Sequence, residues 1–181
     1  MNLRRGGIHF GHLNEEGGGL QSCSLLREFD PAVDFQNNTW DGFVDKVMVF
    51  WLVVRAKIGG ALPSVFANST TTRILEERGK NIEKLMKEAH QNYGPKEKHI
   101  YAVIFATDPD YQGQGYGGQL MKQAGEIADA SSQSCYLERS GEKNRTFYEK
   151  FGYKVAREEL IKDEIDDTEI LIFFIIRPPT F

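Results

Sequence analysis

The chain has 181 residues, of which 40% are hydrophobic and 27% are charged, and its formal net charge is −4. This length suits one domain with a hydrophobic core, and the composition is that of soluble globular proteins and not of disordered chains. The Lys and Arg residues are not massed on any one segment. We therefore expect no nucleic-acid partner, and the acidic balance is compatible with a cationic small molecule.

The cysteine and histidine patterns argue against a metal site. Cys23 and Cys135 are the only cysteines and do not form a Cys-x-x-Cys pair, and the four histidines form no His-Glu-x-x-His pattern. The longest apolar run, residues 47–54, is too short to span a bilayer, and the N-terminus lacks the apolar core of a secretory signal. We expect a cytoplasmic protein with reduced thiols, no metal and no membrane partner.

Regular elements are expected mainly after residue 46. Residues 1–46 are rich in glycine and are predicted to be loose, with a short helix around SCSLLREF. The run VMVFWLVVRA predicts a buried strand, and apolar residues at helical spacing over 68–90 predict one or two helices that stop at Gly94. Residues 99–107, HIYAVIFAT, are apolar on both faces and predict a central strand.

The second half of the chain predicts two more helices and three more strands. An apolar stripe predicts a helix after the glycine-rich loop, and SCYLE predicts a short strand. NRTFYEKF predicts a short helix with Asn144 as its N-cap and Gly152 as its stop. YKVAREELI and EILIFFIIR predict an antiparallel hairpin. The order predicts an α/β or α+β sandwich, divided into a divergent, partly flexible segment 1–46 and a domain 47–181.

The glycine-rich loop fits two phosphate-binding patterns. Gly113, Gly115 and Gly118 fit the dinucleotide pattern G-x-G-x-x-G, with an acidic residue twenty positions later. Gln112, Gly115 and Gly117 fit Q-x-x-G-x-G, which indicates coenzyme A. Both patterns use glycine for close backbone approach, and both place a pyrophosphate at the positive end of a helix.

Three observations favour coenzyme A over a dinucleotide. The segment DPDYQ separates the strand from the first glycine, whereas a dinucleotide-binding glycine follows its strand almost directly. After Glu138 only one short helix and two strands are predicted, too few for a dinucleotide-binding fold. The later NRTFYEKFGY has no role in a dinucleotide fingerprint.

The segments TDPDYQGQGYG, YLERSGEKN and FYEKFGY resemble the GNAT superfamily of acetyl-CoA-dependent N-acetyltransferases. Their sequences are most similar to the branch that contains puromycin N-acetyltransferase, and the resemblance covers residues 47–177. It implies a mixed, mostly antiparallel central sheet that is flanked by helices and splayed at the coenzyme site. It also implies acetyl-CoA as co-substrate and no metal.

The resemblance implies a coenzyme site in three parts: the end of the central strand, the glycine-rich loop and the short helix. A backbone N–H group in the strand would polarise the thioester carbonyl. The loop would wrap the pyrophosphate through its N–H groups. The expected coenzyme-binding residues are Phe105, Ala106, Thr107, Gln112, Gly113, Gln114, Gly115, Tyr116, Gly117, Gly118, Asn144 and Phe147.

Two residues are predicted to carry the proton transfers. The resemblance places Tyr148 near the coenzyme sulfur, where a phenol with a pKa of about 10 could protonate a thiolate whose conjugate acid has a pKa of about 8.5. An aliphatic amine arrives protonated and needs a general base. Glu138 is the candidate, an acid acting through water is an alternative, and His99 is a further candidate.

The sequence supports three hypotheses of function. The first is direct acetyl transfer from acetyl-CoA to an amine of a small molecule. The others are a protein or peptide N-acetyltransferase and a non-catalytic module that binds acyl-CoA. A homodimer is compatible with each of these, and the sequence does not identify the acceptor.

Overall fold

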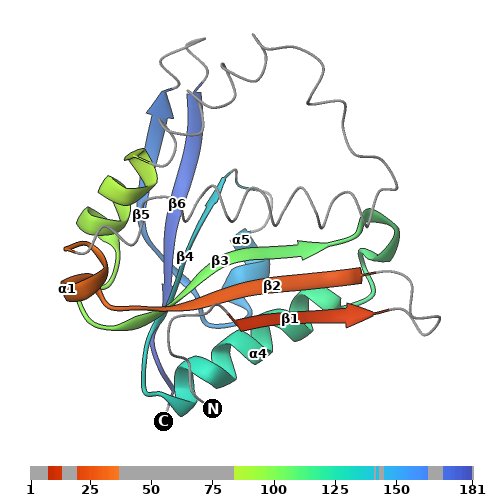
Figure 1. The fold of residues 1–181 in the computed structure, drawn as a ribbon. Coiled ribbons are helices and arrows are strands. Elements are labelled where there is room, and N and C mark those ends of the chain that lie inside the picture. The colour runs from red at the N-terminus through yellow and green to blue at the C-terminus, as the bar shows by residue number, and fades with distance from the viewer. Residues whose placement is uncertain are drawn as a thin grey trace, which may run out of the picture.

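The protein is described by a computed structural model that covers residues 8–13, 20–36, 84–140, 142, 145–162 and 169–180. Its centre is a six-stranded sheet in the order β1-β2-β3-β4-β6-β5 (Figure 1). The strands are β1 (Ile8–Leu13), β2 (Leu20–Phe29), β3 (His99–Thr107), β4 (Cys135–Ser140), β5 (Lys154–Lys162) and β6 (Glu169–Arg177). The helices are α1 (Pro31–Asp34), η1 (Pro109–Tyr111), α4 (Tyr116–Ala130) and α5 (Arg145–Glu149), together with an unlabelled helix at 84–93.

The sheet is mixed and mostly antiparallel, as predicted. Only β3 and β4 run parallel, and the four other strand pairs are antiparallel. The two C-terminal strands form the expected hairpin. The second strand of this hairpin, β6, lies between β4 and β5, so the chain crosses over before it returns to the middle of the sheet.

Helices cover both faces of the sheet. On one face α4 packs against β1, β2, β3 and β4, with a core that includes Met121, Ala124, Leu137 and Phe173. On the other face the helix at 84–93 closes over an aromatic core, together with the segment that follows α1. This second core contains Phe29, Ala89, Tyr101, Tyr136 and Phe174.

The prediction for the N-terminal segment was wrong in one respect. The sequence SCSLLREF is not a helix but most of β2, which pairs with β1 on one side and β3 on the other. Residues from Ser22 to Leu26 are all buried, so both faces of this strand are covered. A strand covered on both faces has no period-two alternation, and a short run of this kind cannot be distinguished from a helix by periodicity.

Some predicted features lie outside the described residues. These are the strand VMVFWLVVRA, the first part of the helical segment that was expected to begin at 68, and Asn144. The division of the chain at residue 46 stays a prediction. The described end of the helical segment does stop before Gly94, whose N–H donates to the His90 carbonyl at 2.9 Å. A Cβ atom on Gly94 would lie 2.5 Å from that same oxygen, so only glycine fits.

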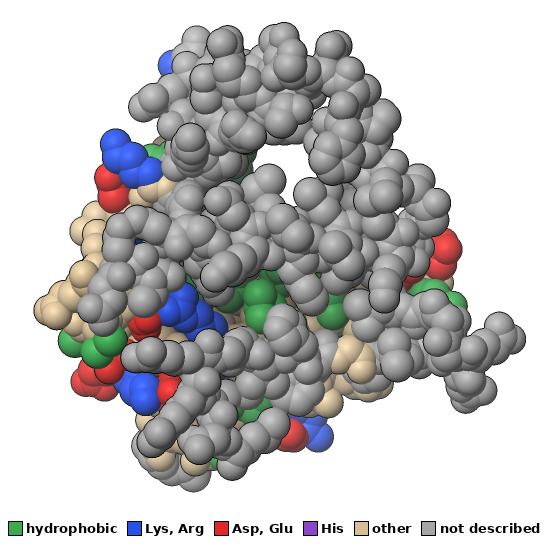
Figure 2. Space-filling model, in the orientation of Figure 1, with side chains coloured by type: hydrophobic (Ala, Val, Ile, Leu, Met, Phe, Trp, Pro, Cys, Tyr) green, Lys and Arg blue, Asp and Glu red, His purple; other side chains and the backbone are tan. Residues whose placement is uncertain are grey.

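The described surface has no strong charge segregation on the face seen in Figure 2, where Lys and Arg side chains lie beside Asp and Glu side chains. Among the helices that the structure describes, none has both the length and the apolar character needed to cross a membrane.

Candidate active site

The loop after β3 begins with a well-fixed turn. Asp108 is buried, its N–H donates to the Gln21 carbonyl on β2 at 2.8 Å, and its carboxylate accepts from the Asp110 N–H at 2.9 Å. Pro109 occupies the first turn of η1, where a missing N–H costs nothing. The turn therefore sets the direction in which the chain leaves the strand.

The glycine-rich part of the loop ends in an open helix N-terminus. Gly113 and Gly115 have φ values of +78° and +89°, a region that residues with a side chain rarely adopt. Gly115 is the N-cap of α4, and no side chain caps the helix there. A Cβ atom on Gly113 or Gly115 would meet no described atom within 4 Å. Within the described residues, the uncapped N-terminus of α4 and its positive dipole end thus border open space beside Gly113 and Gly115, which is the arrangement that binds phosphate groups.

The strands β3 and β4 separate soon after they begin to pair. Their parallel pairing comprises Ile100 with Cys135 and Tyr101 with Tyr136, and in Figure 1 the two strands then diverge. The other edge of β3 stays paired with β2 as far as Thr107. The predicted splay of the sheet is therefore present, and among the strands that the structure describes none pairs with the other edge of the Phe105–Thr107 segment.

The irregularity in β3 lies slightly earlier than the splayed segment. The register with β2 shifts between Leu25 and Leu26, which pair with Ile104 and Ala102, so Val103 is the extra residue. Because the Asp108 N–H points to β2, strand alternation directs the N–H groups of Phe105 and Thr107 toward the open edge. These two groups are the ones placed to meet a ligand in the gap.

The helix α5 packs on the beginning of α4. The Phe147 ring lies 3.6 Å from where a Cβ atom on Gly117 would be, and the Phe151 ring lies 3.3 Å from the corresponding position on Gly118. These two glycines therefore give room to aromatic rings, in addition to any role toward a ligand. The glycine loop and the short helix, which are about thirty residues apart in the sequence, form one structural unit.

Tyr148 lies on the α4 side of the sheet. Its ring contacts those of Phe147 and Tyr153, with centroids 5.4 Å and 6.1 Å away, and the Arg139 guanidinium lies 6.0 Å from its centroid. Burial raises the pKa of the Tyr148 hydroxyl above its usual value, and the charge of Arg139 opposes this only in part. The phenol is therefore protonated at neutral pH and can donate a proton.

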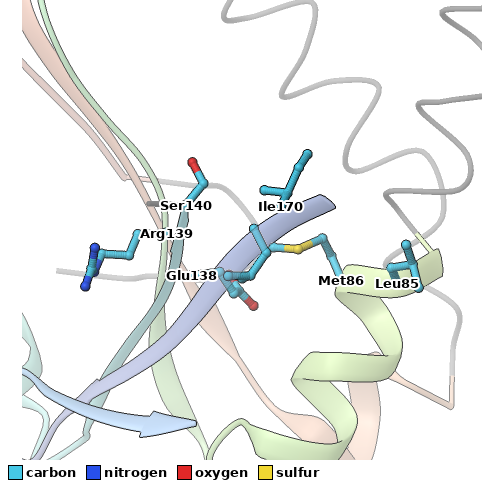
Figure 3. A pocket seen from close by; sticks show the side chains of 7 residues that line it. Leu85, Met86, Glu138, Arg139, Ser140 and Ile170 are labelled. Atoms are coloured by element: carbon cyan, nitrogen blue, oxygen red, sulfur yellow. The ribbon is translucent and has the colours of Figure 1, made fainter. Parts of the chain in front are cut away.

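Glu138 lies on the opposite face of the sheet, at one end of a pocket. The pocket has a volume of about 310 Å³ and is lined by Leu85, Met86, Glu138, Arg139, Ser140, Ile170 and Ile172. Figure 3 shows the Glu138 side chain on the side of β4 that faces the helix at 84–93, whereas Arg139, the next residue on β4, points the other way. A single carboxyl group is thus placed at the end of a largely apolar cavity.

The environment of Glu138 favours the protonated acid. Its side chain is 4% exposed. Burial raises the pKa of this carboxyl to about 7, and the nearby phenols of Tyr136 and Tyr101 limit the increase. A carboxyl group with a pKa near neutrality can accept a proton at physiological pH and release it again, which a general base must do.

The structure brings together most of the predicted coenzyme-binding residues but separates the two predicted catalytic residues. The strand segment, the loop and Phe147 meet around the first turn of α4. Glu138 and Tyr148 instead approach from opposite faces of the sheet. His99 is fully buried at the start of β3, 2.9 Å from His90.

Several site residues were not singled out from the sequence. They are His90, which faces Glu138, and the apolar residues that line the pocket. One signal could have found His90. It lies four residues after Met86 and next to Ala89, so the helical period already places it at the edge of the buried stripe. Within the described ranges, no group of three or more His, Cys, Asp or Glu residues could hold a metal ion.

Comparison with known proteins agrees with this geometry. Residues 70–155 match the family model described as an acetyltransferase (GNAT) domain. The matched residues make up slightly less than half of the chain, and this part of the chain is similar to such a domain. The assignment to the branch of puromycin N-acetyltransferase stays a prediction.

Solved structures share the fold at low sequence identity. Arylalkylamine N-acetyltransferase 2 from Aedes aegypti matches with a TM-score of 0.58 and 14% identity, over 95% of this chain and 73% of that one. A protein from Corynebacterium glutamicum, described as histone acetyltransferase HPA2 and related acetyltransferase, matches with a TM-score of 0.51 and 17% identity, over 99% and 68%. Naa20 from Chaetomium thermophilum matches with a TM-score of 0.50 and 15% identity, and the chain spans 64% of its length.

Proposed function

We propose that the protein is an acetyl-CoA-dependent N-acetyltransferase that transfers an acetyl group directly to the amine of a small molecule. The observation that carries this proposal is the buried carboxyl group of Glu138 at the end of an apolar pocket. A cavity of about 310 Å³ is at the small end of the range for ligand pockets. An amine with an apolar body could therefore fill it and direct its nitrogen to the carboxyl group.

The loop and the splayed strand fit the coenzyme. The uncapped N-terminus of α4 and the open space beside Gly113 and Gly115 suit a pyrophosphate group. The N–H groups of Phe105 and Thr107 would bind a carbonyl oxygen as negative charge develops on it, which the strand pairing supports because it directs them away from β2. Acetyl-CoA, when bound, supplies a thioester that the amine attacks and a thiolate that leaves.

Glu138 would act as the general base. An ammonium group in the pocket cannot attack, and the carboxylate would take one proton from its nitrogen. The carboxyl pKa of about 7 matches this task, because the carboxylate is present at neutral pH and is more basic than an ordinary glutamate. The apolar walls of Leu85, Ile170 and Ile172 would exclude water from the nitrogen.

Tyr148 would act as the general acid from the other face. Its hydroxyl group is protonated at neutral pH, and its helix is anchored to the first turn of α4 by Phe147. Base and acid would then act on opposite sides of the gap between β3 and β4. Such a division suits a transfer in which the amine loses a proton and the departing sulfur gains one.

Two alternative functions remain. The structural neighbours include one protein named for arylalkylamines and one named for histones, so a protein or peptide acceptor is the second candidate. A non-catalytic acyl-CoA-binding module is the third. The enclosed carboxyl group favours a small acceptor, because a peptide backbone needs an open groove with partners for its polar groups.

The test is a turnover assay with two sets of acceptors. Full-length protein and acetyl-CoA would be mixed with small apolar primary amines or with peptides that have free N-termini, and release of the coenzyme thiol would be measured. Both cysteines of the chain are buried, so they add little background to a thiol reagent. Turnover with the small amines that is lost in Glu138→Gln would support the proposal. Turnover with peptides alone, or with neither set, would overturn it.

A further inference from the structure

Two buried histidines form a chain that leads to Glu138. His90 lies on the helix at 84–93, His99 opens β3, and their Nε2 atoms are 2.9 Å apart. The Nδ1 atom of His99 lies 2.8 Å from the Glu97 carbonyl oxygen. The Nδ1 atom of His90 lies 3.8 Å from Glu138 Oε1. Both histidines are at most 1% exposed.

The first contact fixes the proton positions in this chain. A carbonyl oxygen can only accept, so the Nδ1 atom of His99 must carry a hydrogen. In a neutral ring the Nε2 atom of His99 is then an acceptor, and the Nε2 atom of His90 must donate to it. It follows that the Nδ1 atom of a neutral His90 carries a lone pair and directs it to Glu138.

Burial is the main reason that both rings are neutral. Burial, followed by the charges of His99, Arg27 and Lys96, lowers the pKa of His90 to about 2. Burial lowers the pKa of His99 to about 4, and the Glu97 carbonyl, Asp34 and Asp30 oppose this effect. The contact between His90 and Glu138 is therefore not an ion pair at neutral pH.

Among the described residues, the other groups that act on the pKa of Glu138 are phenols. Tyr101 on β3 and Tyr136 on β4 both have hydroxyl pKa values raised, first by burial and then by the charge of Glu138. Both phenols stay neutral at physiological pH. Glu138 is thus the described group of this cluster whose charge changes near neutral pH. The position of the hydrogen on the His90 ring affects the pKa of Glu138.

We propose that His99 holds His90 in the tautomer whose Nδ1 lone pair faces Glu138, and that the two histidines thereby position a proton acceptor behind the general base. This proposal rests on the proposed function of Glu138. When the base takes a proton from the amine, the N–H bond of the ammonium breaks and an O–H bond forms on the carboxyl group. The new O–H can then donate to His90 Nδ1 after a small side-chain movement, which stabilises the protonated product of the step.

The opposite tautomer would have the opposite effect. If the Nδ1 atom of His90 carried the hydrogen, it would donate to the carboxylate and make Glu138 a weaker base. His99 is therefore a positioning residue, although it contacts neither the pocket nor Glu138 in the described residues. His90 and His99 would together raise the basicity of Glu138, although neither ring is charged.

The test begins with the wild-type protein and does not need activity. Two-dimensional ¹H–¹⁵N spectra of the histidine side chains report which ring nitrogen carries the hydrogen. We expect His90 as the Nε2–H tautomer and His99 as the Nδ1–H tautomer, both neutral at pH 6. A His90 ring with its hydrogen on Nδ1, or a charged pair at that pH, would overturn the proposal.

The variant His99→Phe tests the consequence. It removes the acceptor for His90 Nε2 while keeping a ring of similar shape, so the His90 hydrogen is free to move to Nδ1. The Glu138 midpoint, read from ¹³C-carboxyl titration and from the pH profile of kcat/KM, should fall by about one pH unit or more. The matched control is Phe29→Leu, since Phe29 packs on both histidine rings without hydrogen bonding to either.

The outcomes separate this proposal from the proposed function. A lowered midpoint in His99→Phe and an unchanged one in Phe29→Leu would support it. Equal midpoints in the wild type and His99→Phe would overturn it, even if the enzyme is active. If no amine is acetylated, the proposed function fails, while the tautomers and the carboxyl titration still decide whether the histidines position the proton. If His99→Phe does not fold, the wild-type spectra decide alone.

Discussion

The ring of Phe147 lies 3.6 Å from the point that a Cβ atom on Gly117 would occupy, so α5 rests directly on the first turn of α4. Gly117 therefore differs from Gly115, which needs a positive φ and borders open space. Two glycines of the same motif serve different purposes. One admits a neighbouring helix, and the other shapes the loop where phosphate is proposed to bind.

This difference predicts different effects of alanine at the two positions. Gly115→Ala adds a side chain at a φ of +89° and should cost about 1 kcal/mol of folding free energy. Because the loop would also shift, acetyl-CoA affinity should fall by about tenfold or more. Gly117→Ala lies inside the helix, makes only an ordinary contact with Phe147, and should gain up to about 1 kcal/mol from helix propensity.

Urea unfolding and titration calorimetry with acetyl-CoA would measure both effects. The proposed cradle would be in the wrong place if folded Gly115→Ala bound acetyl-CoA as tightly as the wild type. A stability loss in Gly117→Ala larger than that in Gly115→Ala would contradict the assignment of their separate roles.

The Tyr148 hydroxyl offers a second test. Tyr148→Phe keeps the ring and its packing against Phe147 and Tyr153, but removes the proton that would go to the leaving sulfur. If Tyr148 is the general acid, kcat should fall by about 10²–10⁴-fold while coenzyme affinity changes little. The loss should be smaller with an acyl donor whose thiol is more acidic. Near-normal kcat under conditions where chemistry limits the rate would reduce Tyr148 to a packing residue.

The helices and strands from His99 onward were predictable because the sequence patterns that indicate them are formed by residues close together in the chain. The strand prediction for residues 99–107 coincides with β3, and the apolar stripe from Leu120 to Ala128 identifies α4. The glycine spacing placed the loop between them. Each of these signals depends on residues that are close in the sequence, where periodicity and turn chemistry are reliable guides.

The features that were missed depend on contacts between distant residues. Nothing near Leu25 indicates that β1 and β3 will cover its strand on both edges. The position of β6 between β4 and β5 is likewise a matter of tertiary pairing. The proximity of His90, His99 and Glu138 requires the helix at 84–93 to pack over β3 and β4, which no local pattern reveals.

A third prediction concerns stability at the C-terminal end of the sheet. The Arg177 guanidinium binds the Asp129 carboxylate through two contacts of 2.8 Å and 2.7 Å, and the backbone and hydroxyl group of Thr180 bind the same carboxylate. Arg177 and Thr180 hold the pKa of Asp129 well below its usual range. The stabilisation is therefore present above the ordinary carboxyl pKa and is lost as the pH falls below it.

Asp129→Asn should thus destabilise the protein by about 1 kcal/mol at pH 7, with a smaller difference from the wild type below about pH 3. Denaturant unfolding at several pH values would measure it. The matched control is Glu126→Gln, because the Lys122–Glu126 pair on the same helix is mostly exposed and should contribute little. Equal effects of the two substitutions at pH 7 would contradict the special role of the Asp129 cluster.

The last prediction concerns Glu138, whose buried carboxyl should cost stability while it supports catalysis. Burial raises its pKa from 4.5 to about 7. Between these values the folded chain keeps a proton that the unfolded chain has released, so stability falls as the pH rises through this window. A shift of this size corresponds to about 3 kcal/mol at pH 8. Glu138→Gln should therefore be more stable than the wild type by up to about 3 kcal/mol at pH 8, and the two proteins should converge toward pH 4.5.

In the wild type kcat/KM should rise with pH through about 7, because the ionised carboxylate is the active form, and the variant should lose most of its turnover. Unfolding curves at pH 5 and pH 8 would be compared with the pH profile, with the exposed Glu126→Gln again as control. A variant that gains no stability at pH 8 would show that Glu138 is solvated and titrates normally. A stabilised variant that still acetylates amines at the wild-type rate would show that the buried carboxyl is not the base, and the proton would then have to leave the amine through water.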